Sequence, residues 1–498
     1  MQRKSFKPCS PPSITNLLHR HSDPLASLAL APHSTNRPVF KLFNHYVRTA
    51  SLLRAVFDTL LVFLVVAAGL VLPEGNRALA MPLLGTHALS LAAGLFVITS
   101  ASGVYEMRPH QSPTQAMSRG LFALLLGLPL AYLILSLLPI DFAHRQAIQW
   151  SAMGGVAAVI LRRVYVTHRA AQPRARARVL IYGSGAPAAA VAATLRQSDP
   201  DVLIVGFLPG PNEKQPEVPS AELLGGGSKL ADIAYAHQVD EIVVALTERR
   251  AGSMPLRELL DCKLAGIKVC DINTHFEKSM GLIRLEYLNA GWLIFGDGFN
   301  QGTWRTLVKR AFDLLCAVLL LTVAAPLMLI ATLLIKLESR GPVLYRQERV
   351  GLNGHPFQIA KFRSMRTDAE QDGTPRWATA NDDRVTRVGK IIRRLRIDEL
   401  PQLLNVFKGE MSLVGPRPER PFFVDQLTQE IPYFAVRHSV KPGVTGWAQV
   451  RYQYGATVED AQAKLQFDLY YVKNHSLFLD IVILLETVSV VLTGKGAR

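Results

Sequence analysis

The chain has 498 residues, 49% of them hydrophobic, and its 55 lysines and arginines against 39 aspartates and glutamates give a formal charge of +16. An apolar and strongly basic chain is unusual for a soluble enzyme, and a nucleic-acid binder would not need long apolar runs, whereas membrane proteins collect lysine and arginine on their cytoplasmic side. The four cysteines are scattered and show no Cys-x-x-Cys spacing, so they suggest neither a disulfide framework nor a zinc site, and a reducing, cytoplasm-facing location fits best.

Residues 1–45 are rich in proline, serine, histidine and basic residues and lack periodicity, so we expect a flexible cytoplasmic tail. No apolar segment with a small-residue cleavage site follows the basic start, which argues against a secretory signal.

Four apolar runs follow, and each approaches the roughly 20 residues that cross a bilayer as a helix. They predict four transmembrane helices within residues 46–170, with the runs at 51–72, 79–100, 118–140 and 146–166. Basic residues flank the first run, the second connection and the end of the fourth run, while the other connections hold few charges. By the positive-inside tendency, both ends of the block are cytoplasmic. The alternative is a set of buried helices in a soluble core.

A short β-rich run at 179–182 leads into Gly183-Ser184-Gly185 and an alanine-rich helix, and strand-like runs recur at 202–208, 241–246 and 267–272. This alternation predicts a Rossmann-like α/β domain over 177–275, followed by a linker at 276–304. Gly183 and Gly185 are the candidates for a nucleotide loop. Ala188 stands where the third glycine would be, and no acidic residue convincingly ends the second strand. A regulatory or scaffolding domain that binds no dinucleotide during turnover therefore remains open.

Residues 312–335 form a fifth apolar run, which is long enough to span a bilayer. Basic residues flank it on both sides, however, and Pro326 lies inside it, where a proline removes a hydrogen bond and bends a helix. We expect a re-entrant helix over 306–336 that enters the cytoplasmic leaflet, breaks at Ala325-Pro326 and returns. A kinked spanning helix is the alternative, and it would place the basic C-terminal part outside the cell.

The adjacent carboxylates Asp398 and Glu399 follow three arginines and precede a predicted helix with Pro401 in its first turn. Asp398 could simply cap that helix. In the functional interpretation, the nearby cations, Arg396 among them, keep a carboxylate ionised, and it attacks phosphorus while its neighbour holds Mg²⁺ together with substrate phosphates.

Cations suited to phosphate lie on both sides of this pair. Lys361, Arg363 and Arg417 are candidate substrate-binding donors, because phosphoryl transfer depends on positioning and charge neutralisation. The prolines around Arg417 predict a rigid loop, and Gly443 and Gly446 suggest tight turns. A basic face against anionic lipid is the alternative role for some of these arginines.

Several ordered motifs over residues 305–498 resemble the bacterial sugar transferases, the monotopic polyprenyl-phosphate phosphoglycosyl transferases. They are the apolar segment with Pro326, KRAFD at 309–313, KFRSM at 361–365, DELPQ at 398–402, GPRPE at 415–419, PGVTGWAQV at 442–450 and DLYYVKN at 468–474. AGWLIFGDGF at 290–299 is similar to the linker of EpsB-type, exopolysaccharide-initiating members. The expected fold is therefore a mixed membrane protein: a four-helix transmembrane block, a Rossmann-like α/β domain, and a re-entrant-helix α/β catalytic domain.

The resemblance implies that Asp398 attacks the β-phosphate of a UDP-sugar, releases UMP and passes the phosphosugar to undecaprenyl phosphate. It also implies that Glu399 binds Mg²⁺, or Mn²⁺ in its place, that Arg417 contacts the nucleotide or phosphate, and that NAD is not required. The family usually has Ser-Pro at the kink, where this chain has Ala325-Pro326. The expected location is the bacterial inner membrane, multi-pass, with the catalytic domain cytoplasmic and no nucleic-acid partner.

The sugar stays open between glucose and galactose, with a lean to glucose, and a homodimer is compatible with the sequence. Two other functions remain in view. One is a membrane-anchored Rossmann oxidoreductase or NAD-responsive regulator, although residues 177–275 hold no recognisable Tyr-x-x-x-Lys pair. The other is a non-enzymatic scaffold for polysaccharide assembly. The last apolar stretch, interrupted by Asp480 and Glu486, predicts a helix packed on the domain or lying at the membrane interface.

Overall fold

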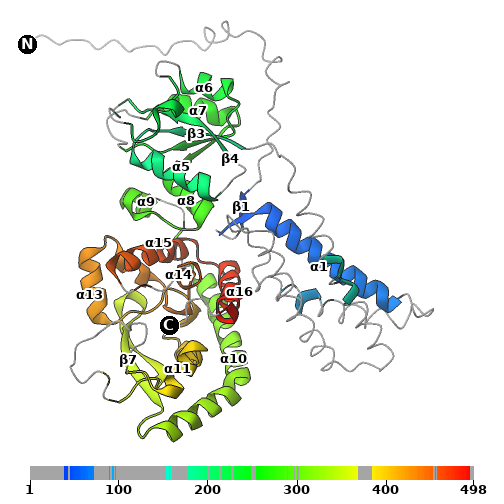
Figure 1. Ribbon diagram of the computed structural model, residues 1–498, viewed down its shortest axis with the longest axis vertical. Coiled ribbons are helices and arrows are strands. Elements are labelled where there is room, and N and C mark those ends of the chain that lie inside the picture. Colours follow the sequence, from blue (N-terminus) through cyan, green and yellow to red (C-terminus); the bar gives the residue numbers. More distant parts are fainter. Residues whose placement is uncertain are drawn as a thin grey trace, which may run out of the picture.

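The computed structural model describes residues 39–71, 177–369 and 384–493 apart from short gaps, with isolated positions within 89–96 and 153–159 (Figure 1). The first predicted apolar run is helical, as α1 (Thr49–Val71). The other three predicted runs and the predicted tail up to residue 38 lie largely outside the described residues. The end of that tail forms β1 (Val39–Leu42), which pairs with β2 (His45–Arg48) in an antiparallel hairpin.

The predicted Rossmann-like domain is confirmed as a four-stranded parallel sheet in the order β4-β3-β5-β6. Its elements are β3 (Ala177–Tyr182), α5 (Ala186–Ser198), β4 (Val202–Leu208), α6 (Leu230–Ala236), β5 (Glu241–Val244), α7 (Leu256–Leu264), β6 (Lys268–Asp271) and α8 (Ile272–Met280). The chain adds β4 on one side of β3, and then adds β5 and β6 on the other side. The strand order therefore reverses between β3 and β5. In open parallel sheets, ligands bind beyond the carboxyl ends of the strands at such a reversal.

Helices cover both faces of this sheet, as Figure 1 shows. Alternate residues of β3 point to opposite faces, so Val179 and Ile181 pack with α5 and α8, whereas Leu180 and Tyr182 pack with α6 and α7. The nearly continuous apolar runs of the strands are therefore explained by burial on both sides.

A second α/β domain follows, and it is built around a core shared by α12, α15 and α16. It comprises the hairpin β7 (Leu344–Val350) and β8 (Pro356–Phe362), α11 (Arg387–Arg394), α12 (Gln402–Lys408), α13 (Pro421–Glu430), the parallel pair β9 (Ser412–Val414) and β10 (Gly443–Thr445), α14 (Trp447–Arg451), α15 (Val458–Asn474) and α16 (Leu477–Thr493). Tyr470 and Tyr471 of α15 are its largest fully buried side chains. The predicted tight turn at Gly443 is wrong, because Gly443 lies in β10, where a Cβ would collide with the backbone of Gly415, directly after the neighbouring strand β9.

The last helix, α16, packs on the domain through Leu479 and Ile483. The acidic residue that interrupts its apolar run has structural partners: Asp480 accepts hydrogen bonds from Lys309 Nζ at 2.6 Å and from Tyr471 Oη at 2.7 Å. One of the two predicted roles for this segment, packing against the domain, is therefore confirmed.

The helix α10 (Thr303–Glu338) is the one described helix whose length and composition would let it cross a membrane. It is hydrogen-bonded as a single helix through Pro326, so the predicted break is a bend, which Figure 1 shows along its length. Pro326 leaves the carbonyl of Thr322 without its helical donor, and the Thr322 hydroxyl donates to Val318 O at 2.9 Å. Threonine back-bonding of this kind bends helices, and it supplies a hydroxyl near a kink where Ala325 has none.

Both ends of α10 are fixed to the same α/β domain. Near its start, Arg310 donates to the carbonyl oxygens of Val406 and Phe407 at 2.6 and 2.8 Å, at the end of α12. Near its end, Ala331 and Ile335 pack in one cluster with β8 and α11. Between Ala317 and Ala331 no residue of the helix is buried. The helix therefore leaves the domain and returns to it.

The linker joins the two α/β domains through polar contacts that are protected from water. Trp447 Nε1 donates to Gly281 O at 2.7 Å, and Lys473 Nζ of α15 pairs with Glu277 of α8 at 2.8 Å. Glu277 and Lys473 are only 2% and 7% exposed. A buried ion pair contributes little relative to apolar residues, but the loss of one partner leaves a buried charge without compensation.

Replacing Glu277 with alanine should therefore lower the unfolding free energy by about 3–5 kcal/mol, because Lys473 stays buried without its carboxylate. Thermal and denaturant unfolding of the full chain in detergent measures this. The double variant Glu277→Leu/Lys473→Met should recover most of the loss, and Glu286→Ala, at an exposed acid in the linker, should change the free energy by less than about 0.5 kcal/mol. Equal stability of Glu277→Ala and the unmodified protein would contradict the role of the pair.

Candidate active site

The two predicted carboxylates lie in one tight turn between two helices. The helix α11 ends at Arg394 with Leu395 as its C-cap, Arg396 adopts a left-handed backbone with φ of 58°, and a 3₁₀ turn spans Ile397–Glu399. The helix α12 starts three residues after Glu399, and no side chain caps either this turn or α12. The structure therefore does not support Asp398 as a helix cap.

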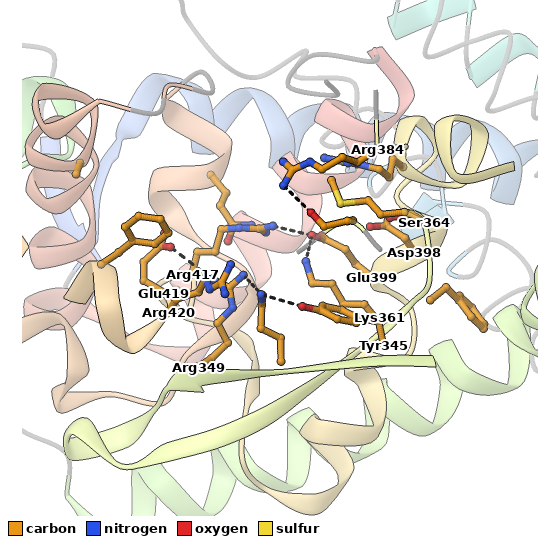
Figure 2. A pocket seen from close by; sticks show the side chains of 18 of the residues that line it. Tyr345, Arg349, Lys361, Ser364, Arg384, Asp398, Glu399, Arg417, Glu419 and Arg420 are labelled. Atoms are coloured by element: carbon orange, nitrogen blue, oxygen red, sulfur yellow. Dashed lines mark hydrogen bonds and ion pairs between the residues drawn. The ribbon is translucent and has the colours of Figure 1, made fainter. Parts of the chain in front are cut away.

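Glu399 is held by three cations, and Figure 2 shows the side chains of Lys361 and Arg417 converging on it. Its Oε1 accepts hydrogen bonds from Lys361 Nζ on β8 at 3.0 Å and from Arg417 Nη2 at 2.7 Å. Its Oε2 lies 3.8 Å from Arg396 Nη1. Burial alone would raise the pKa of Glu399, but the charges of Arg417 and Lys361 outweigh burial and hold the pKa well below its usual value. Glu399 is therefore a fixed anion.

Asp398 differs from Glu399 in its hydrogen bonding and in the direction of its pKa shift. It is 8% exposed and lines the cavity described below, and among the described residues no donor hydrogen-bonds to its carboxylate. Burial, followed by the charge of Glu399, raises the pKa of Asp398 to about 6, against the opposing charges of Lys361 and Arg393. A carboxylate without hydrogen bonds, facing a cavity and surrounded by cations, is chemically available to act as a nucleophile.

The loop that presents Arg417 is itself fixed from behind. Pro416 and Pro418 flank Arg417, and Arg437 Nη2 donates to the Arg417 carbonyl oxygen at 2.9 Å. Arg437 is in turn anchored to Asp468 of α15, with Nε and Nη2 at 3.1 and 2.8 Å from the same carboxylate oxygen. Both partners are buried. The predicted rigid presentation of Arg417 therefore has a structural cause beyond its prolines.

Arg363, which the sequence suggests as a phosphate donor, makes structural contacts. Its Nη1 donates to Arg340 O at 3.0 Å, and its Nη2 donates to Ser339 O at 2.9 Å and to Ser339 Oγ at 2.8 Å. These oxygens belong to the C-terminal end of α10, where helices leave carbonyls unpaired. Arg363 still borders the cavity, but both of its terminal nitrogens hold the end of α10.

The carboxylates and their cations line a cavity of about 680 Å³. Its walls carry ten basic residues against four acidic ones, so its charge and size are complementary to a polyanion of nucleotide size. The basic residues are Arg349, Lys361, Arg363, Arg366, Arg384, Arg393, Arg417, Arg420, Arg437 and Lys464.

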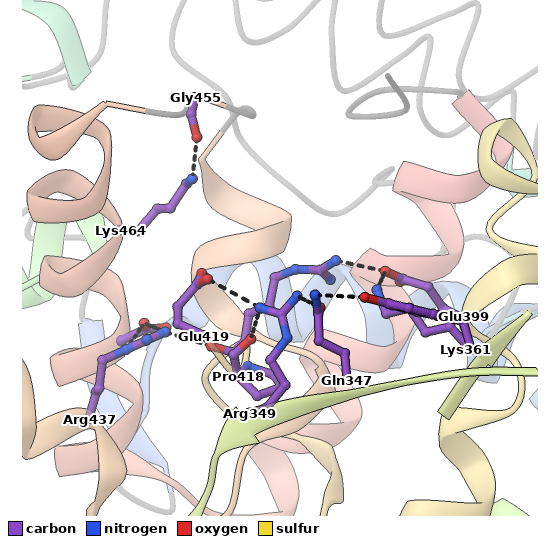
Figure 3. Close-up of polar contacts among 12 residues, drawn as sticks. Gln347, Arg349, Lys361, Glu399, Pro418, Glu419, Arg437, Gly455 and Lys464 are labelled. Atoms are coloured by element: carbon purple, nitrogen blue, oxygen red, sulfur yellow. Dashed lines mark hydrogen bonds and ion pairs between the residues drawn. The ribbon is translucent and has the colours of Figure 1, made fainter. Parts of the chain in front are cut away.

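Arg349 belongs to this set although motif reasoning does not single it out. Figure 3 shows it between Gln347 and the loop of Arg417. Its Nη1 donates to Pro418 O at 3.1 Å, its Nη2 donates to Gln347 Oε1 at 2.8 Å, and it lies 3.5 Å from Glu419. Burial lowers the pKa of Arg349. The available signal is the two-residue period of β7, which puts Tyr345, Gln347 and Arg349 on one face.

The donor set can be tested against the divalent cation that the family resemblance implies. No group of three or more His, Cys, Asp or Glu side chains in the described part of the chain could hold a metal by itself. Mg²⁺, however, commonly takes one or two carboxylates and completes its shell with substrate phosphates and water. Because both hydrogen bonds to Glu399 go to Oε1, its Oε2 is the oxygen that fits such a role, as in the sequence-based prediction.

The other predicted loop, at Gly183 and Gly185, lies in the Rossmann-like domain, apart from this cavity. Gly183 has a φ of 136°, and a Cβ there would collide with the carbonyl of Ala245, which explains the need for glycine.

Comparisons with known proteins agree with these features. Residues 304–494 match the family described as bacterial sugar transferase, and residues 100–254 match a CoA-binding domain. A UDP-N-acetylgalactosamine-undecaprenyl-phosphate N-acetylgalactosaminephosphotransferase of Aeromonas hydrophila is 45% identical over 263 residues, 53% of this chain and 61% of that protein. A UDP-glucose:undecaprenyl-phosphate glucose-1-phosphate transferase of Caulobacter vibrioides is 49% identical over 192 residues, 38% of this chain and 71% of that protein.

A third relative, the exopolysaccharide production protein PSS of Rhizobium leguminosarum bv. phaseoli, is 44% identical over 198 residues, 38% of this chain and 98% of that protein. The match therefore spans less than two thirds of the Aeromonas protein but nearly all of the Rhizobium protein. The part of the chain that matches the bacterial sugar transferase family, residues 304–494, includes the residues that line the cavity.

Asp398→Asn should raise the stability of the fold, on the order of 1 kcal/mol near neutral pH, because an amide avoids the cost of a buried charge without hydrogen bonds. A raised carboxyl pKa means that ionised Asp398 destabilises the fold. The advantage of asparagine should therefore shrink as the pH falls through about 6 and disappear below 3.8, where the wild-type carboxyl is protonated in both states. Thermal melting in a chelating buffer measures it, with Asp425→Asn on the exposed side of α13 as the control. A lower melting temperature for Asp398→Asn would show that Asp398 has a structural role.

Proposed function

Because the chain belongs to the bacterial sugar transferase family, we propose that it transfers a hexose 1-phosphate from a UDP-sugar to undecaprenyl phosphate and so begins an exopolysaccharide repeat unit. The observation that carries this proposal is the contrast between the two adjacent carboxylates. Glu399 is fixed by Lys361 and Arg417, while Asp398 faces a cationic cavity without a hydrogen bond from a described residue. The relatives are named for glucose and for N-acetylgalactosamine, so the donor class is a UDP-hexose or UDP-N-acetylhexosamine.

The proposed reaction proceeds by two displacements at one phosphorus atom. In the first, an Asp398 oxygen attacks the β-phosphorus of the UDP-sugar, and the bond from that phosphorus to the bridging oxygen breaks. UMP leaves with the bridging oxygen, and the phosphosugar stays on Asp398 as an acyl phosphate. In the second, a phosphate oxygen of undecaprenyl phosphate attacks the same phosphorus, and Asp398 is released as a carboxylate. Covalent catalysis of this kind lets two dissimilar substrates use one site in turn.

The cations provide charge neutralisation for these displacements. Lys361 and Arg417 reach the cavity while they bind Glu399, so their positions are set before substrate arrives. A Mg²⁺ ion held by Glu399 and the substrate diphosphate would offset charge on the leaving phosphate. The raised pKa of Asp398 favours proton uptake, and a bound cation would favour the ionised nucleophile.

A re-entrant position of α10 in the cytoplasmic leaflet is the second part of the proposal. It is supported by the attachment of both helix ends to one domain and by the exposed apolar stretch between them, where Val323 and Leu329 are 69% and 72% exposed. Ile391 of α11 and Phe407 of α12 are also exposed apolar residues among basic neighbours, which fits contact with anionic headgroups. The catalytic domain of this inner-membrane, multi-pass protein would then lie on the cytoplasmic side.

Asp398→Asn should abolish UMP release from UDP-sugars, because an amide cannot form the acyl phosphate. The purified full-length protein is incubated with Mg²⁺, undecaprenyl phosphate and a panel of UDP-sugars, with UMP as the readout. Asp425→Asn should keep full activity, and chelation of the metal should remove the activity reversibly. Turnover by Asp398→Asn above a few per cent of the unmodified rate would exclude Asp398 as the nucleophile.

Cysteines placed at Trp304 and at Leu337, near the two ends of α10, should both react with a membrane-impermeant thiol reagent from the cytoplasmic side alone. Both side chains are strongly exposed, at 76% and 73%. The labelling uses inverted and right-side-out vesicles of a variant with its four native cysteines replaced. A cysteine in the connection 73–78, which the charge pattern assigns to the outer side, serves as the control. Labelling of the two α10 positions from opposite sides would establish a spanning helix instead.

A further inference from the structure

The glycine loop of the Rossmann-like domain already holds an anion that belongs to the chain itself. Glu213 lies in the segment after β4, and its Oε2 accepts hydrogen bonds from Ser184 N at 2.6 Å, Ser184 Oγ at 3.1 Å and Gly210 N at 3.2 Å. Its Oε1 accepts hydrogen bonds from Thr247 N at 3.1 Å and Thr247 Oγ1 at 3.2 Å. Five donors therefore converge on one half-buried carboxylate.

The position of these donors is as informative as their number. Ser184 follows β3, Gly210 follows β4 and Thr247 follows β5, so the donors come from the carboxyl ends of three neighbouring strands. The reversal of strand order lies between β3 and β5, where sheets of this kind bind their ligands. Backbone N–H groups at a glycine loop are the usual partners of a nucleotide phosphate. In this chain the donors at this position bind the Glu213 carboxylate.

Backbone hydrogen bonds also hold the segment of Glu213 against the glycine loop. Glu217 N donates to Ser184 O at 2.8 Å, and Gly183 N donates to Leu208 O at 2.8 Å. Burial alone would raise the pKa of Glu213, but the backbone hydrogen bonds from Thr247, Ser184 and Gly210 lower it below its usual value. The carboxylate is ionised at neutral pH, so it competes with any incoming anion at full charge.

We propose that Glu213 is an internal substitute for a ligand phosphate, which closes the anion site of the Rossmann-like domain to nucleotides of the coenzyme A type. The domain of the unmodified chain then works without a bound nucleotide, and its donors are satisfied from within. Removal of the carboxylate uncovers a site for a phosphate ester. This inference concerns the Rossmann-like domain and is independent of the proposed transferase reaction.

Glu213→Ala in the full-length protein should gain affinity for coenzyme A by at least about tenfold, because an anion–amide cluster of this kind contributes more than 1.4 kcal/mol. Titration calorimetry with coenzyme A measures the gain. The same variant should melt at a lower temperature than the unmodified protein and recover when coenzyme A is added, whereas the unmodified protein should not respond. Glu213→Gln, which keeps the side-chain shape, should show a smaller gain and covers the case in which alanine prevents folding.

Three controls assign the binding to this site. Glu217→Ala, at an exposed acid of the same segment, should gain nothing. Glu213→Ala/Gly185→Val should lose the gain, because a side chain at Gly185 would collide with the Thr247 hydroxyl. Glu213→Ala/Arg417→Ala should keep it, since Arg417 belongs to the other cavity. The proposal is overturned if the unmodified protein binds coenzyme A as tightly as Glu213→Ala, or if neither Glu213 variant gains affinity.

Discussion

One carboxylate oxygen, Oε1 of Glu399, sets the arrangement of the active site. This oxygen accepts hydrogen bonds from Lys361 of β8 and from Arg417 of the loop after β9. A strand, a loop and the turn before α12 therefore meet at a single atom. Because the buried charge of Glu399 needs both cations, none of the three segments can move far without exposing an unpaired charge. This fixed cluster leaves the adjacent Asp398 as the carboxylate that faces the cavity without a hydrogen bond from a described residue. Rigidity of one acid and availability of its neighbour are therefore two results of the same packing.

The helix α10 is connected to the same cluster through neighbouring residues. Arg363 lies two residues after Lys361 and binds the oxygens at the end of α10, while Ile397 lies one residue before Asp398 and packs with Ala331 and Ile335. A change in the depth or tilt of α10 would therefore move both the strand that carries Lys361 and the turn that carries Asp398. For an enzyme whose acceptor stays in the bilayer, this connection would fix the height of the nucleophile relative to the lipid surface.

The sequence predicts the elements well and their long-range contacts poorly. The strands of the Rossmann-like domain carry buried apolar runs between helical stretches, so local pattern is enough to locate them. The presence of cations close to Asp398 and Glu399 follows from charge and spacing. The contact of Arg363 with the end of α10 cannot be predicted from the sequence. A basic residue beside a phosphate motif has the same local pattern whether it binds substrate or the end of a helix. Gly443 was misassigned for a related reason: a glycine required by a close strand neighbour resembles one required by a turn. The hydrogen bonds of Glu213 with Ser184 and Thr247 join residues that are 29 and 34 positions apart, so no local sequence pattern predicts them.

The acids that lie in the interior of the described domains differ in whether a partner binds their carboxylate. Glu277 pairs with Lys473, Asp480 with Lys309, and Asp468 with Arg437. The half-buried Glu213 accepts hydrogen bonds from five uncharged donors at the glycine loop. In each case the carboxylate has partners that belong to the fold. Asp398 departs from this rule, since the cations around it act at a distance and no described donor binds its oxygens. Leaving this carboxylate without a hydrogen-bond donor contributes nothing to the stability of the fold, which agrees with the proposed role of Asp398 as the nucleophile.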